Sequence, residues 1–337
     1  MADNKAINIV ADWDEDWTEW AAHNLAMGVP ATDVTDELVT AGMTEASALA
    51  MVERIGSDPV FRAARRLGKD IRKWEVLSDT LLELEGQTHD YKRIERVSNL
   101  TSEAFHERFY ALNRPVILTD VVTNWPAITK WDLDFLATHF GHQQITYQHG
   151  RSRQDHRDAF VDHSTKAMLG EYIDLIRGGG ETNDYYLIAH DKLLDRPEFK
   201  PLLEDIVFDP RYLNGVDQPG RVFFWLGPKG AVTPMHRDLG NVFFCQVMGR
   251  KQVTLIPSRQ MHLVYNETGY HSEIDFERDD LSDYPRLERA HVVEEVIAPG
   301  EMLFIPLGWW HAVKSLDVSI TVTGNNFRFP NVFTEIF

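Results

Sequence analysis

The spacing of hydrophobic residues divides the chain into a helical first part and a strand-rich remainder. From residue 13 to about residue 84, apolar positions recur at intervals of three, four and seven, which is typical of amphipathic helices. Asp58 followed by Pro59 is typical of a helix N-cap and first turn, and predicts a long helix from that point. Its apolar positions are Val60, Ala64, Leu67, Ile71, Trp74 and Leu81. Shorter helices are expected at residues 17–25 and after Thr44.

The pattern changes after Gly86 to mixed helix and strand. Amphipathic helices are predicted at residues 102–112, 133–139 and 168–176. Strands are predicted at 94–100, 114–118, 185–189, 221–226, 242–247, 252–256, 292–297, 302–305, 312–314 and 319–323. Short strands separated by Gly, Pro and Asp turns favour a sandwich or barrel. We therefore expect a helical N-terminal region, residues 1–90, followed by a mainly β domain, residues 91–337.

Composition narrows the class of protein. The 337 residues include 43% hydrophobic side chains, which excludes a disordered chain, and 34 basic against 52 acidic residues give a net charge of −18. This acidity argues against broad wrapping of nucleic acid. Cys245 is the single cysteine, which excludes an internal disulfide and a cysteine-based zinc site. The chain start shows no signal-peptide pattern and no apolar run approaches a membrane span, so we expect a cytoplasmic protein without membrane contact.

The predicted long helix carries an unusual density of positive charge. Its cations are Arg62, Arg65, Arg66, Lys69, Arg72 and Lys73. A solvated helix face is the favoured interpretation, and a docking face for an acidic partner or nucleic acid is the alternative. An exposed apolar stripe is unfavourable, so the helix must pack on the chain itself or on a second copy. With the apolar segment at 329–333, the stripe suggests a homodimer.

Two distant motifs form a candidate metal site. His236 and Asp238 lie two positions apart on a predicted strand, so their side chains share one face. His311, after a Pro-Gly turn and a tight Ile-Pro-Leu-Gly corner, is the candidate third ligand. Two imidazoles and one carboxylate on one face of an octahedral ion leave three positions open, the pattern of non-haem Fe(II) oxygenases. Zinc with the same ligands, and hence hydrolysis, is an open alternative.

Other residues near these motifs have ordinary interpretations. We expect surface positions, with substrate contact as the alternative, for His262, His271 and His291. Aromatic residues that are candidates for an apolar lining, although plain core packing is the commoner role, are Phe223, Trp225, Trp309 and Trp310.

These motifs resemble the Jumonji C (cupin-8) family of Fe(II)- and 2-oxoglutarate-dependent oxygenases. The resemblance covers about Ile94 to Phe327 and is nearest to the hydroxylase branch that includes the asparaginyl hydroxylase of hypoxia-inducible factor. The flanking runs at 113–118, 124–127 and 130–131 also look like the entry segment of this family. The resemblance implies a double-stranded β-helix, a cupin or jelly-roll barrel with the metal inside one end.

Family roles carried over by motif assign the site. The resemblance implies that His236, Asp238 and His311 bind iron. It implies 2-oxoglutarate contacts for Lys251, Thr233, Tyr186 and Asn326, with the lysine pairing with the distal carboxylate. The chain departs from the family at Val242, where relatives often carry asparagine; Asn241 stands one position earlier. Either residue is a candidate for that contact.

The expected function is Fe(II)- and 2-oxoglutarate-dependent hydroxylation of an amino-acid side chain in a protein or peptide. The alternatives are demethylation of N-methyl-lysine, hydroxylation of a small molecule or free amino acid, and a noncatalytic metal-binding cupin scaffold.

Overall fold

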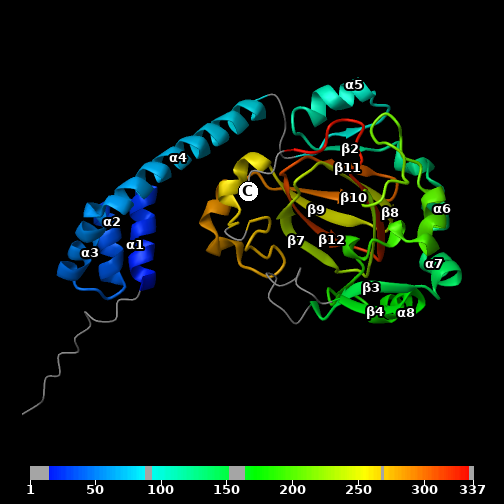
Figure 1. Ribbon diagram of the computed structural model, residues 1–337, viewed down its shortest axis with the longest axis horizontal. Helices are drawn as coiled ribbons and strands as arrows, with labels where there is room; N and C mark the ends of the chain where they lie inside the picture. Colours follow the sequence, from blue (N-terminus) through cyan, green and yellow to red (C-terminus); the bar gives the residue numbers. More distant parts are fainter. Residues whose placement is uncertain (1–14, 88–92, 152–163, 267–268, 334–337) are drawn as a thin grey trace, which may run out of the picture. The chain divides into compact units, whose positions relative to one another are not determined.

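The computed structural model describes residues 15–87, 93–151, 164–266 and 269–333 (Figure 1). The chain divides into two compact units, Met1–Glu85 and Gly86–Phe337. The predicted boundary between residues 90 and 91 lies outside the described residues.

Four helices build the N-terminal unit: α1 (Glu15–Met27), α2 (Ala31–Thr40), α3 (Glu45–Ser57) and α4 (Pro59–Gly86). As predicted, the long helix begins at Pro59, and Asp58 Oδ1 accepts hydrogen bonds from the amides of Val60 and Phe61 at 2.6 and 3.1 Å. The core of the unit contains Ala21, Val34, Leu38, Ala48 and Ile55. Helix α2 was not predicted, since only Val34, Leu38 and Val39 mark an apolar face in ten residues.

Helix α4 approaches α1 closely at one glycine. A Cβ atom on Gly68 would lie 2.7 Å from the carbonyl oxygen of Ala26, closer than a side chain tolerates. Glycine at this position therefore allows the two helices to touch through their backbones, although it lowers the helix propensity of α4.

Three sheets build the second unit, and every neighbouring pair of strands is antiparallel except β1 with β2. The six-stranded sheet has the order β1 (Arg96–Val97), β2 (Val116–Leu118), β11 (Met302–Ile305), β8 (Val242–Met248), β13 (Ser319–Gly324), β6 (Val222–Gly227). The four-stranded sheet has the order β10 (Val293–Ile297), β9 (Lys251–Ile256), β12 (Trp310–Ser315), β7 (Val232–Arg237). The third sheet has the order β4 (Ser164–Met168), β3 (Gln144–His149), β5 (Tyr185–Tyr186). The predicted mainly β cupin-like barrel is confirmed; β3 and β4 were not predicted.

Helices pack around these sheets. They are α5 (Ser102–Phe105), α6 (Pro126–Lys130), α7 (Leu133–Phe140) and α8 (Leu169–Gly179), with a π-helical turn at His106–Tyr110 after α5. Short 3-10 segments lie at Val122–Asn124, Ala189–Asp191, Leu193–Asp195, Pro197–Asp205, Ser258–Leu263, Leu281–Asp283 and Pro285–Arg289. Among the described residues, no helix has both the length and the hydropathy needed to cross a bilayer.

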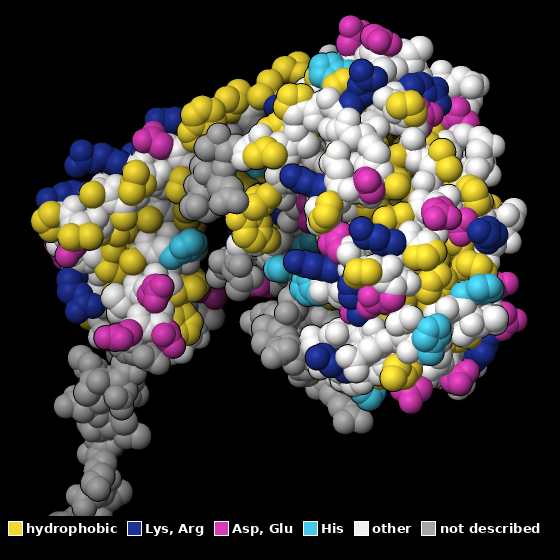
Figure 2. Space-filling view, turned by 45° about the vertical axis from the view of Figure 1, so that its right-hand side comes forward, with side chains coloured by type: hydrophobic (Ala, Val, Ile, Leu, Met, Phe, Trp, Pro, Cys, Tyr) yellow, Lys and Arg dark blue, Asp and Glu magenta, His cyan; other side chains and the backbone are white. Residues whose placement is uncertain are grey.

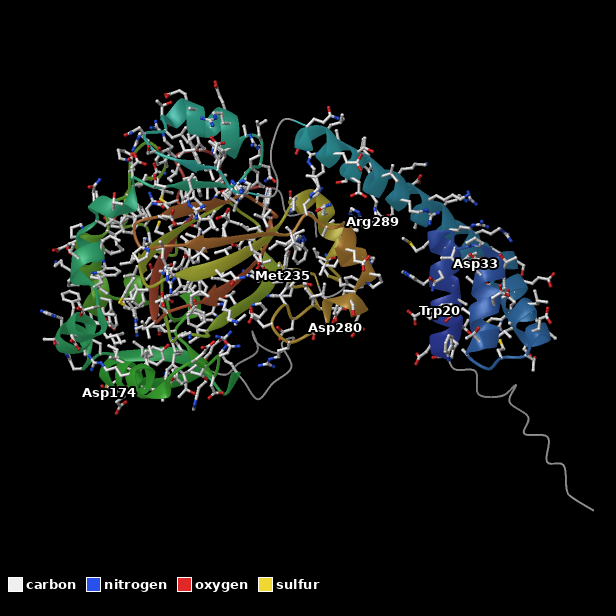
Figure 3. The ribbon with its side chains drawn as sticks, turned by 180° about the vertical axis from the view of Figure 1, so that it is seen from behind. Trp20, Asp33, Asp174, Met235, Asp280 and Arg289 are labelled. Atoms are coloured by element: carbon white, nitrogen blue, oxygen red, sulfur yellow. The ribbon has the colours of Figure 1, made fainter. Side chains whose placement is uncertain are left out.

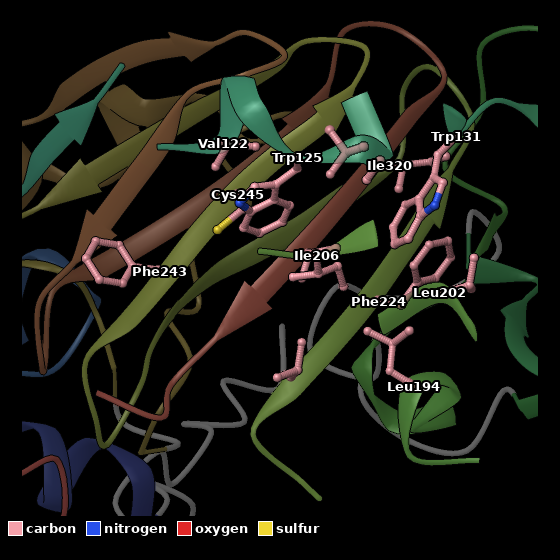
Figure 4. Packing of buried hydrophobic residues seen from close by; sticks show 14 of the residues in the cluster. Val122, Trp125, Trp131, Leu194, Leu202, Ile206, Phe224, Phe243, Cys245 and Ile320 are labelled. Atoms are coloured by element: carbon pink, nitrogen blue, oxygen red, sulfur yellow. The ribbon is translucent and has the colours of Figure 1, made fainter. Parts of the chain in front are cut away.

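Strand β8 separates the structural core from the barrel interior. Phe243 and Cys245 point to one face of the sheet. There they belong to the same buried cluster as Trp125, the residue before α6 (Figure 4). Phe244 points to the opposite face and borders a cavity inside the barrel. Because successive side chains of a strand alternate between faces, one strand both holds the outer core together and lines the interior.

Phe243 is expected to be a principal stabilising residue of the barrel. Its ring lies 5.5 Å from Phe105, 5.5 Å from Phe304 and 4.8 Å from Phe327, measured between centroids. Phe243→Ala should lower the free energy of unfolding by about 3–5 kcal/mol, because it leaves a cavity among these rings. Guanidinium unfolding measures the loss. The exposed control Val207→Ala should change stability by less than about 0.5 kcal/mol; a loss below about 1 kcal/mol for Phe243→Ala would contradict the packing described.

Candidate metal centre

The pairing of two strands brings the three proposed ligands together. In the antiparallel register of β7 with β12, His236 lies directly opposite His311. Met235, labelled in Figure 3, marks this part of β7. Asp238 follows the last residue of β7, and its Oδ2 lies 3.8 Å from His311 Nε2. One ligand atom from each of the three residues can be chosen so that all lie within 4.8 Å of one another, a spacing that suits one shared ion.

Backbone carbonyls orient both imidazoles. His236 Nδ1 lies 2.8 Å from the carbonyl oxygen of Pro234, and His311 Nδ1 lies 3.0 Å from that of Trp309. A carbonyl oxygen only accepts hydrogen bonds, so Nδ1 carries the proton in each ring and Nε2 keeps its lone pair for a metal. Such outer hydrogen bonds are a common feature of metal-binding histidines.

The surroundings also favour the metal-binding protonation state of His236. Desolvation in the barrel, and then the positive charge that His311 would carry, lower the pKa of His236 to about 4. The imidazole is therefore neutral near pH 7, which is the form that binds metals. Two imidazoles and one carboxylate are a donor set that fits a divalent ion such as Fe(II).

A cavity of about 600 Å³ adjoins the three ligands. Phe223 and Trp225 of β6 line it, which agrees with the alternative interpretation of these residues as an apolar lining. Trp309 and Trp310 do not: Trp309 Nε1 donates to the Asn113 carbonyl, and Trp310 is buried in a separate cluster. Of these four aromatic residues, the two on β6 therefore contribute to the cavity surface, and the two in the segment that carries His311 do not.

His271 lines this cavity and is half-buried, which differs from the expected surface position and agrees with the alternative of a substrate contact. It pairs with His236 through an isolated β-bridge, and the two rings stack with centroids 6.0 Å apart. Burial, and then the neighbouring His236, lower the pKa of His271. No local pattern marked this residue, because a loop far along the chain brings it to β7.

Lys251 occupies the position expected of a cosubstrate anchor. Its side chain is fully buried, and its Nζ donates a 2.8 Å hydrogen bond to the hydroxyl of Tyr186, which lines the cavity. The Nζ also lies 5.4 Å from the ring centroid of Phe244. In the described part of the chain, no carboxylate forms an ion pair with this ammonium. A buried cation without a counterion is costly, so the arrangement favours a ligand that brings a carboxylate.

The remaining predicted contacts divide between cavity and scaffold. Thr233 lines the cavity on β7. Asn326 does not line it: its amide nitrogen donates to the carbonyls of Asn214 and Gly215. Asn325 borders the cavity instead, two positions after Thr323. Asn325, and not the predicted Asn326, therefore borders the cavity, because strand-like alternation turns adjacent side chains to opposite sides.

Asn241 and Val242 differ in what they offer a ligand, although both border the cavity. The Asn241 amide nitrogen donates to Asn331 Oδ1, and its oxygen accepts from the Leu307 amide, both at 2.8 Å. Its polar atoms therefore tie the C-terminal segment to the corner before His311. Val242 contributes an apolar surface to the cavity.

Arg151 is a neighbour of the site that sequence reasoning missed. It is buried, its guanidinium lies 5.3 Å from the ring centroid of Tyr186, and it donates to the carbonyl of Val232. Burial lowers the pKa of Arg151 to about 10. Tyr186 is therefore held between two cations, Arg151 and Lys251. The residues around Arg151 show no sequence pattern that predicts its contact with Tyr186, because the contact depends on the third sheet.

Comparison with known proteins agrees with this geometry. A family model described as "Cupin-like domain" matches residues 102–332. The chain is 30% identical over 241 residues to lysine-specific demethylase JMJ30 of Arabidopsis thaliana, covering 69% of this chain and 54% of the relative. It is 31% identical to lysine-specific demethylase 8 of Danio rerio, covering 69% and 58%, and 30% identical to HSPB1-associated protein 1 of Rattus norvegicus, covering 69% and 52%.

The chain therefore belongs to the cupin-like domain family, and its relatives place it among the Jumonji C proteins. It spans about half the length of the curated relatives it matches. The names of these relatives do not single out the asparaginyl-hydroxylase branch that the motifs suggested. The comparisons therefore identify the family and do not distinguish between its branches.

Metal binding should depend on both histidines. His236→Ala and His311→Ala should each weaken Co(II) binding at least about 100-fold, since even the loss of an outer hydrogen bond costs 10- to 100-fold. The visible absorption of bound Co(II) reports the titration. His142→Ala, at an exposed histidine of the same domain, is the control and should bind as the wild type does. Unchanged affinity in either ligand variant would place the metal elsewhere.

Proposed function

We propose that the protein is an Fe(II)- and 2-oxoglutarate-dependent oxygenase that hydroxylates a side chain of a protein or peptide. The observation that carries this proposal is the combination of a one-sided His236, Asp238, His311 cluster with the buried, counterion-free ammonium of Lys251. When bound, iron with 2-oxoglutarate supplies an oxidant that inserts one oxygen atom of O₂ into a C–H bond, while the cosubstrate becomes succinate and CO₂.

The residues of this chain bind and orient the reactants. His236, Asp238 and His311 would hold the metal and leave its opposite side facing the cavity. Lys251 and the hydroxyl of Tyr186 would bind the distal carboxylate of 2-oxoglutarate, with Thr233 as a further hydroxyl donor. Phe223 and Trp225 would exclude water from the face where the substrate enters.

The charge of the cavity supports an uncharged target side chain. Among the described residues that line it, Asp238 is the only carboxylate, and the metal would occupy that group. A cationic lysine or arginine side chain would therefore enter without an acidic partner and beside Arg237, which also lines the cavity, and burial of such an unpaired charge is unfavourable. This supports hydroxylation of a neutral side chain.

Demethylation of N-methyl-lysine is the second candidate, and the similarity to two proteins named lysine-specific demethylases supports it. The same oxidation of an N-methyl group releases formaldehyde, whereas hydroxylation of a side chain retains the added oxygen. The products therefore separate the two activities.

Turnover should leave a defined set of products. The protein with Fe(II), 2-oxoglutarate and a peptide library should form succinate together with a peptide that gains one oxygen atom, as mass spectrometry measures. His236→Ala should form neither. Formaldehyde in an amount equal to succinate would support the demethylase. Oxidation of free amino acids alone would favour a small-molecule enzyme, and wild-type protein that binds metal without any 2-oxoglutarate turnover would favour the scaffold.

Lys251→Met should raise the KM for 2-oxoglutarate by at least about tenfold, because a charge-assisted hydrogen bond contributes about 1.5–3 kcal/mol. Without cosubstrate, the variant should be as stable as the wild type or more stable, since a buried cation without a counterion is removed. Steady-state kinetics and thermal unfolding measure the two effects. Lys200→Met, at an exposed lysine, should leave both unchanged. An unchanged KM in Lys251→Met would remove this lysine from the cosubstrate site.

A further inference from the structure

Helix α4 presents an apolar stripe that the described helices of the N-terminal unit leave uncovered. Its side chains recur at intervals of three, four and seven, and Val60, Leu67 and Trp74 are 77%, 66% and 71% exposed. The stripe, named here the α4 stripe, consists of Val60, Leu67, Ile71, Trp74, Leu77, Leu81 and Leu84. Figure 2 shows hydrophobic side chains following this helix. A different face of α4, which carries Gly68, packs on α1.

The charges beside the stripe are divided between the two halves of the helix. Residues 60–73 contain six cations, Arg62 to Lys73, and the single acid Asp70. Residues 74–86 contain four acids and no cation. The acids are Glu75, Asp79, Glu83 and Glu85. One half of α4 is therefore positive and the other negative.

We propose that α4 pairs with α4 of a second copy of this chain in an antiparallel coiled coil. An apolar seam repeating every three and four residues is what paired helices bury. Antiparallel pairing sets the positive half of each helix against the negative half of the other, whereas parallel pairing sets like charges together. A two-fold axis makes both contacts identical, as expected of a homodimer. The charge division thus selects a second copy of α4 over an unrelated acidic partner or nucleic acid.

The positions of the apolar residues also define a register. If the centre of the α4 stripe lies on the two-fold axis, Val60 faces Leu84 of the partner helix and Leu67 faces Leu77, while Ile71 and Trp74 lie beside the axis. The 28 residues of α4 span about 42 Å, long enough for about four heptads.

Oligomeric state tests the proposal with the full chain. Sedimentation equilibrium at micromolar concentration should show a dimer. Ile71→Glu should weaken self-association at least about tenfold, because each copy places a charge at the seam. Leu112→Glu is the matched control: Leu112 and Ile71 are both 52% exposed, but Leu112 lies in the barrel unit. Circular dichroism should show unchanged helix content in both variants, and Trp74→Glu serves as the second seam variant.

Cysteine cross-linking tests the orientation. A mixture of Leu67→Cys and Leu77→Cys chains should form a disulfide-linked dimer on mild oxidation. Leu67→Cys alone should not, because its two copies would lie about 15 Å apart along the axis, beyond the roughly 7 Å that a disulfide spans. The native Cys245 is buried and stays in all variants.

Each contrary outcome overturns the proposal. A monomeric wild type at micromolar concentration means that the stripe packs within one chain. A dimer that Ile71→Glu and Trp74→Glu leave intact uses another surface, and efficient cross-linking of Leu67→Cys with itself means parallel helices. A monomer that binds RNA or DNA through the positive half, with steep salt dependence, assigns α4 to nucleic acid instead.

Discussion

The proposed chemistry depends on the antiparallel pairing of β7 with β12. This register sets His236 opposite His311, and the turn after β7 brings Asp238 within 3.8 Å of His311. A shift by one residue would turn one imidazole to the outer face of the sheet and separate the ligands. The backbone also supplies the carbonyls that orient both rings, so the same two strands place the ligands and set their tautomers.

The second feature of the site is a pair of buried cations beside Tyr186, and their burial makes them functionally important. Lys251, Tyr186 and Arg151 form a compact group in which a tyrosine ring lies between two buried cations. Buried positive charge needs a stabilising partner, and none of the described carboxylates reaches Lys251. A dicarboxylate cosubstrate supplies the negative charge that the described residues do not place at Lys251. The aromatic surface of Phe223 and Trp225 leaves the rest of the cavity suited to a neutral side chain.

The N-terminal unit follows different physical rules. Its small core lies among α1, α2 and α3, and α4 continues as a long helix with one face on that core and another exposed. The barrel has buried its apolar surface within one chain, whereas α4 has not, and its opposite charges at the two ends complement a reversed copy of itself. The proposed catalysis and the proposed assembly thus lie in separate units of the chain.

Local patterns in the sequence determined the helix that begins at Pro59, the strands from β6 to β13, and the ligand pair His236 and Asp238. Each of these depends on neighbours in sequence: a capping residue, alternation along a strand, or two side chains on one face. Tertiary structure decided what depends on distant segments. It brought His271 and Arg151 to the site, and it placed Asn325 instead of Asn326 at the cavity. It also left Trp309 and Trp310 out of the cavity lining. The reason is physical. A shift of one residue at the end of a strand reverses which side chains face the cavity, and a loop from another sheet can add side chains to it. Neither effect is visible in the local periodicity of the sequence.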